Sequence, residues 1–106
     1  MATGFYSADL AATTNTTLAT VTASTVSVGT INIVNRNATS VKVRVAIAAT
    51  GTPSASEYIE YDLNLTPAGT SGATYNNSGI IAQAGKNIVV YSDTANVSAA
   101  YWHIEE

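Results

Sequence analysis

The sequence predicts an all-β protein, a single-domain antiparallel β-sandwich or jelly roll of about seven to eight strands. Apolar and polar residues alternate with a period of two along most of the 106-residue chain. No segment carries a sustained helical stripe between caps. Stretches rich in Gly, Pro, Asn and Asp interrupt the alternation at intervals of about ten residues, the spacing expected of short strands joined by turns.

Residues 1–15 are predicted to form an N-terminal arm or an edge strand, and residues 16–106 the sandwich domain. Phe5, Tyr6 and Leu10 are the large apolar side chains of a stretch otherwise rich in Ser, Thr, Ala and Asn. The pattern alone leaves open whether these residues pair with a sheet or reach a neighbouring subunit.

The first strands of the domain are predicted at residues 16–23, where the alternation is weak, and at residues 24–35. In the second of these, two valines and two isoleucines fall on opposite parities on either side of Gly29: Val26, Val28, Ile31 and Ile33. A glycine between two parities predicts a β-bulge or bend, at which the strand changes its facing. The Asn-rich residues 35–40 then supply a turn.

Residues 40–49 give the clearest alternation. Lys42 and Arg44 occupy one face, and the other face carries Val41, Val43, Val45 and Ile47. This is the pattern of a half-buried antiparallel strand.

Residues 58–65 alternate in the same way, and Pro67 and Gly69 end the strand. Glu60 and Asp62 are predicted to face outward, and the inward face is predicted to carry Ile59, Tyr61, Leu63 and Leu65. The last strands are predicted at residues 73–82, 87–92 and 97–104, separated by turns at residues 83–87 and 92–96.

The charge content is unusual, because 10% of the residues are charged, against about 25% in an average soluble domain. The net charge is −3, and the basic residues are Arg36, Lys42, Arg44 and Lys86. So few cations argue against a nucleic-acid partner, which requires a clustered basic patch. A surface of small polar residues suggests instead that part of it is covered, since interface cores are depleted of charge.

Other classes of site are excluded by simple observations. The chain has no cysteine, so it can form neither a disulfide framework nor a thiolate metal site. No secretory signal and no apolar run long enough to span a bilayer is found, so synthesis in the cytoplasm and no membrane partner are expected. No phosphate-binding glycine loop or cofactor fingerprint occurs, and neither enzymatic activity nor a cofactor is expected.

Three carboxylates, Glu57, Glu60 and Asp62, lie close enough in sequence to suggest a cation site. Alternate carboxylates also describe any solvated strand, and the spacing is not that of a calcium loop. We favour the structural interpretation, in which Lys42 and Arg44 form cross-strand pairs with Glu60 and Asp62.

His103 is the single histidine, so a serine triad or a typical zinc site would have to use it. No G-x-S-x-G motif surrounds any serine, and a packed or interfacial histidine is the favoured interpretation. Tyr75, Tyr101 and Trp102 could form an aromatic platform for a sugar. The strand period, however, puts Tyr101 and His103 on one face and Trp102 and Ile104 on the other, so at least one pair belongs to a core or an interface.

The chain resembles a family of small structural proteins from the virions of tailed bacteriophages. The resemblance covers roughly residues 31–106 and rests on strand and turn signatures: the NRNAT turn before VKVRVA, YIEYD leading to Pro67 and Gly69, the GII…AGKNIVV hairpin, and ANVS before the final Glu105 and Glu106. These motifs support a family but no chemistry.

The resemblance implies a non-enzymatic capsid decoration, or cement, protein with a β-sandwich fold, which bridges and stabilises major capsid subunits. Its expected partners are the major capsid protein and copies of itself in a homotrimer or another cyclic oligomer, and its expected location is the virion, on the capsid surface rather than the tail. A tail, baseplate or fibre component is the first alternative, and a glycan-binding β-sandwich module is the alternative from another class. Because aromatics are enriched at interface cores, the candidate oligomer or capsid contacts are Phe5, Tyr6, Leu10, Tyr101, Trp102 and Ile104.

Overall fold

The computed structural model describes residues 3–106, which form eight strands and one short 3-10 helix. The strands are β1 (Gly4–Leu10), β2 (Thr16–Thr20), β3 (Val26–Asn35), β4 (Val41–Ala48), β5 (Tyr58–Leu65), β6 (Thr74–Gln83), β7 (Asn87–Ser92) and β8 (Val97–Glu105). The helix η1 (Ala55–Glu57) lies between β4 and β5. The prediction of an all-β sandwich is confirmed, and the N-terminal residues 4–10 are an edge strand.

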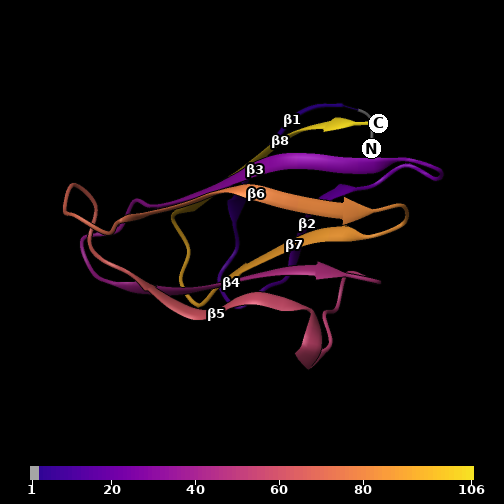
Figure 1. The fold of residues 1–106 in the computed structure, drawn as a ribbon. Coiled ribbons are helices and arrows are strands. Elements are labelled where there is room, and N and C mark those ends of the chain that lie inside the picture. The colour runs from indigo at the N-terminus through magenta and orange to yellow at the C-terminus, as the bar shows by residue number, and fades with distance from the viewer. Residues whose placement is uncertain (1–2) are drawn as a thin grey trace.

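Two four-stranded antiparallel sheets make up the two layers seen in Figure 1, with strand orders β1-β8-β3-β6 and β2-β7-β4-β5. The pairs β1–β8, β2–β7, β3–β6 and β4–β5 are nested, as in one long hairpin. The hairpin is rolled so that β8 also pairs with β3, and β7 with β4. This arrangement of eight strands is a jelly roll.

The core lies between the two sheets and consists almost entirely of aliphatic side chains from alternate strand positions. Val41, Val43 and Val45 on β4 are fully buried, as their alternation predicts. The largest buried side chain is Tyr101 on β8, which lies opposite Ile31 on β3.

Strand β3 does not change its facing at Gly29, so that prediction is wrong. Gly29 shares the inward parity with Ile31, and a bulge lies in the partner strand β6 instead, where Ile80 and Asn77 pair with residues 29 and 31. The alternation in β3 is therefore uninterrupted. As a consequence, Val26 and Val28 face outward and are exposed.

Strand β5 also departs from its predicted facing. Ile59 and Tyr61 were expected inward, but both are exposed. The pairing of β5 with β4 shifts twice, and Asp62 within the first shift has a φ of 53°. The first shift adds a residue to β5, so that Tyr61 faces outward and Glu60, which is predicted to face outward, instead pairs with the inward-facing Val45. The second shift returns Tyr58 to the outer side, opposite Ala46.

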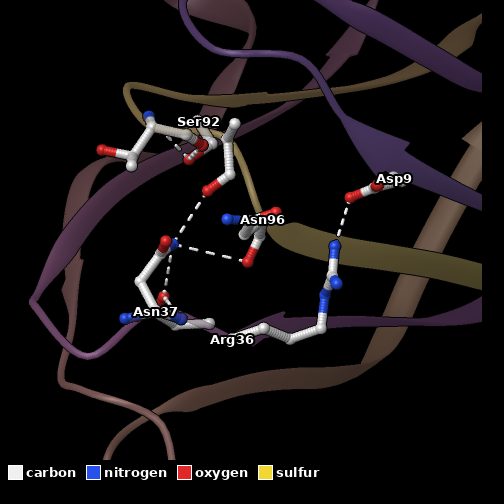
Figure 2. Close-up of polar contacts among 8 residues, drawn as sticks. Asp9, Arg36, Asn37, Ser92 and Asn96 are labelled. Carbon is white, nitrogen blue, oxygen red and sulfur yellow. Dashed lines mark hydrogen bonds and ion pairs between the residues drawn. The ribbon is translucent and has the colours of Figure 1, made fainter.

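Asparagine side chains tie the turns together at one end of the sandwich. The Asn37 amide donates to the carbonyl oxygens of Ala95 (2.8 Å) and Asn96 (3.4 Å), and Figure 2 shows it directed at that turn. Beside it, Arg36 forms an ion pair with Asp9 of β1. These contacts fasten the edge strand β1 and the turn before β8 to the turn after β3.

Candidate functional site

The most unusual surface of the protein is the outer side of the sheet β1-β8-β3-β6, at one end of its strands. Phe5 pairs with Trp102, and Val28 pairs with both Ile104 and Ile81. Directly paired residues project from the same side of a sheet. We call this surface the apolar face and define it by Phe5, Val26, Val28, Ile81, Trp102 and Ile104.

The six side chains of the apolar face are between 39% and 65% exposed. The rings of Phe5 and Trp102 stack on each other with their centroids 6.0 Å apart. Single exposed apolar residues are ordinary on protein surfaces, but a contiguous patch is typical of an interaction site. The apolar face spans four neighbouring strands and meets that description.

Few charged side chains lie around the apolar face. On the outward positions of β1, β3, β6 and β8, as alternation and pairing assign them, the one charged side chain is Asp9, at the other end of β1 and paired with Arg36. Directly after β8, the exposed Glu106 exchanges two backbone hydrogen bonds with Val26 (2.9 and 3.0 Å) and borders the apolar face there. Near that end the small residues of β8 leave a hollow of about 460 Å³, whose lining includes Phe5, Ser7, Asp9, Asn32, Val34, Ser98 and Ala100. The sheet therefore presents an apolar ridge beside a hollow whose charged lining residue, Asp9, is paired with Arg36.

Of the contact residues predicted from sequence, Phe5, Trp102 and Ile104 come together on the apolar face. Tyr101 and Leu10 do not, because their side chains are 0% and 2% exposed and fill the core. Tyr6 lies on the inward side of β1, packed against the core, with its ring 5.6 Å from that of His103. For Leu10 and Tyr101 the expectation of a direct contact is therefore corrected.

Val26, Val28 and Ile81 also belong to the apolar face, although their sequence pattern does not predict them as site residues. Each belongs to a strand whose alternation, taken alone, is compatible with a buried position. The signal that brings them together is the register between strands distant in sequence, which places Val28 between Ile104 and Ile81.

A group of polar residues is buried beneath the sheet, close to the apolar face. The hydroxyl of Ser27 lies 2.7 Å from the Tyr101 hydroxyl and 2.8 Å from Nδ1 of His103. Burial raises the pKa of the Tyr101 phenol, although its hydrogen bond to Ser27 acts in the opposite direction. Ser27 is completely buried, so it has no access to a substrate in this conformation.

His103 is 5% exposed, and its Nε2 atom has no hydrogen-bond partner within residues 3–106. The expected division of the last strand is confirmed: Tyr101 and His103 face inward, while Trp102 and Ile104 face outward. Tyr75 also packs against the core. Tyr75, Tyr101 and Trp102 therefore do not form one aromatic platform.

The acidic residues around β5 have separate structural roles. Nε of Arg44 donates to Oδ1 of Asp62 at 2.7 Å, which confirms one of the two predicted cross-strand pairs. Lys42 pairs with Asn64 rather than Glu60. The Glu57 carboxylate accepts the backbone N–H groups of Ser54 (2.8 Å) and Ala49 (3.0 Å).

Glu57 thus closes the segment between β4 and β5, and these hydrogen bonds lower the pKa of its carboxyl group below the ordinary value of 4.5. Across the described residues 3–106, no three His, Asp or Glu side chains are grouped so that they could hold a metal ion.

The comparisons with known proteins add no identity. The chain matches no known protein-family model, no curated protein and no solved structure. The resemblance to virion proteins therefore stays a prediction. Within residues 3–106, no helix is long and apolar enough to cross a membrane.

Proposed function

We propose that the protein is a non-enzymatic structural component of a tailed-phage virion, a capsid decoration protein that docks through its apolar face. The observation that carries the proposal is the contiguous cluster of exposed apolar side chains on four strands, centred on Val28 between Ile104 and Ile81. Its proposed partners are the major capsid protein and neighbouring copies of the same chain.

The chemistry of the apolar face supports docking onto a protein. Phe5 and Trp102 supply aromatic area, and aromatic residues are enriched in the cores of protein interfaces while charged residues are depleted there. A chain of net charge −3 repels its own copies. The six side chains of the apolar face carry no charge, so they add nothing to that repulsion.

The scaffold supports the same role. Jelly rolls occur in viral capsid domains, although this fold also serves other functions. A virion offers many symmetric positions, so that modest contacts made by each subunit can add up to firm attachment. The virion setting itself rests on the sequence resemblance, and a tail, baseplate or fibre position is the alternative within the same proposal.

The test is binding of purified protein to virions of its own phage that lack it, followed by sedimentation and electron microscopy. Val28→Asp places a carboxylate at the centre of the apolar face, and we expect binding at least about 100-fold weaker because the charge would be buried without a partner. Ile59→Asp is the matched control, since Ile59 is 40% exposed on the other sheet and Val28 43%. The control should bind like the wild type.

The location of the bound subunits distinguishes the alternatives. Density on the capsid lattice supports decoration, and density on the tail assigns the protein to the tail structures. A strictly monomeric protein that binds neither part of the particle contradicts the proposal, as does wild-type binding by a folded Val28→Asp variant.

A further inference from the structure

A cluster of tyrosines surrounds Arg44 on the outer side of the second sheet. The guanidinium carbon of Arg44 lies 4.2 Å from the ring centroid of Tyr61 and 4.5 Å from that of Tyr91. Tyr58 meets Tyr61 edge to face, with the centroids 4.9 Å apart and the planes at 79°. The arrangement joins strands β7, β4 and β5 into one aromatic surface around a single cation.

A hollow of about 540 Å³ opens beside the tyrosine pair, lined by Ala55, Tyr58 and Tyr61. Its volume is within the range of small-molecule sites, about 300–1,000 Å³. Because the two rings are nearly perpendicular, they form two walls of an aromatic notch. Tyr61 is 58% exposed, so its ring is accessible to a ligand.

The notch is held in place before any ligand arrives. Tyr58 packs on a small buried cluster of Ala46, Ala48 and Val89 on the same side of the sheet. Ala55 belongs to η1, whose segment is closed by the hydrogen bonds to the Glu57 carboxylate. A preorganised site avoids much of the entropy loss that weakens ligand binding.

Arg44, which lies over the ring of Tyr61, and its partner Asp62 place polar groups beside the notch. Arg44 uses Nε to bond Oδ1 of Asp62, and within residues 3–106 no hydrogen bond engages its two Nη groups or Oδ2 of Asp62. Arg44 offers only donors and Asp62 only acceptors, and as an ion pair they carry no net charge. A hydroxyl group, which both donates and accepts, can satisfy either partner.

We propose that this notch binds a neutral saccharide. The apolar C–H face of a sugar ring stacks on Tyr61 or Tyr58, and its hydroxyl groups bond the free atoms of Arg44 and Asp62. A charged ligand is disfavoured because it would have to compete with the existing ion pair. The site lies on the sheet opposite the apolar face, so the inference does not depend on the proposed docking function.

The experiment is an NMR titration of the folded protein with neutral sugars: glucose, galactose, mannose, N-acetylglucosamine and their β-linked disaccharides. We expect at least one sugar to shift the amide signals of Ala55, Tyr58 and Tyr61 in a saturable manner at millimolar concentration. Tyr61→Ala should weaken that binding about fivefold to tenfold, the effect of one lost aromatic contact. Tyr61→Phe retains the ring and should bind nearly as well as the wild type.

Two further variants locate the ligand. Asp62→Asn removes the carboxylate while asparagine still tolerates the positive φ of 53° at this position, and it should weaken binding. Phe5→Ala is the matched control, because it removes an exposed aromatic ring from the apolar face and should leave sugar binding unchanged.

The proposal is overturned if none of the sugars shifts these signals, or if a folded Tyr61→Ala variant binds as the wild type does. Shifts centred on Trp102 instead would move the site to the other sheet. A proline-rich peptide that binds the notch when the sugars do not would assign it to peptide recognition, the other use of aromatic-lined grooves.

Discussion

Gly29 and His103 face each other across strands β3 and β8 so closely that a Cβ atom on Gly29 would lie 2.7 Å from the Cβ of His103. The same added atom would lie 2.7 Å from the ring of Tyr101. No side chain fits in this position unless the strands move apart. The glycine thus lets the Tyr101 and His103 rings lie under the sheet while β3 continues without a break.

Gly29→Ala is therefore expected to destabilise the protein by about 1–3 kcal/mol, the usual effect of overpacking a core. Urea denaturation followed by fluorescence of Trp102 measures the change. Gly51→Ala is the control, since its nearest contact would be a Thr17 hydroxyl at an ordinary 3.5 Å. An alanine at position 29 that leaves the midpoint unchanged would contradict the close packing.

The edge strand β1 should contribute to stability as well as to the apolar face. Leu10 is 2% exposed, and truncating such a residue to alanine costs about 2–5 kcal/mol. We expect Leu10→Ala to lower the free energy of unfolding by this amount, whereas Phe5→Ala, on the exposed side of the same strand, should change it little. Thermal and urea unfolding of the two variants test the difference.

Because Leu10 belongs to the core, deleting the N-terminal residues is not a clean test of whether they bind a partner. Removing residues 1–12 to test an arm would remove a core residue together with the exposed ring of Phe5. Loss of binding by such a truncated protein would not separate docking from folding, and point variants on the outward side of β1 are the cleaner test.

A third prediction concerns Asn35, which is 1% exposed and bonds two turns and the end of β5. Its amide donates to the carbonyl oxygens of Thr39 and Thr66, both at 2.9 Å. It also donates to the buried carbonyl oxygen of Leu65 at 3.4 Å. Asn35→Ala removes the donor from this buried carbonyl and from the two part-buried ones, so we expect a loss of about 1–3 kcal/mol in unfolding free energy. Asn64→Ala, at an exposed position of β5, serves as the comparison and should have little effect.

Much of the fold follows from alternation in the sequence. The valines of β4 predict their own burial, because a polar residue separates each of them from the next. β3 and β5 differ because apolar side chains there occupy both parities, as with Val28 and Ile31, or Tyr58 and Ile59. Such a strand can face either way, and the bulges that decide between the two lie in its pairing with another strand.

In the candidate sites too, alternation predicts some features, and the pairing between strands decides the others. Alternation separates Trp102 and Ile104 from Tyr101 and His103 along a single strand, but it does not show which pair faces outward, and the sequence therefore predicts Tyr101 as a contact too. The notch of Tyr58 and Tyr61 could not be predicted, since ideal alternation would place residues 58 and 61 on opposite faces. The irregular pairing around Asp62 brings their rings together.

The last prediction concerns pH. Hydrogen bonds from the N–H groups of Ser54 and Ala49 hold the pKa of the Glu57 carboxyl below 4.5. A carboxyl whose pKa is lowered by folding stabilises the folded segment above its unfolded value, and this contribution is lost as the pH falls through the folded pKa. We therefore expect the segment 49–57 to loosen below pH 4.5 while the sandwich stays folded.

Amide hydrogen exchange measures this loosening. The protection factor of the Ala49 N–H should fall at acidic pH and should be low at every pH in Glu57→Gln, whose amide replaces the charged acceptor with a weaker one. The Ala68 N–H, which donates to the backbone carbonyl of Asn37 at 2.9 Å, is the internal control and should keep its protection. Equal protection of Ala49 above and below pH 4.5 would show that the Glu57 carboxylate does not hold the segment closed.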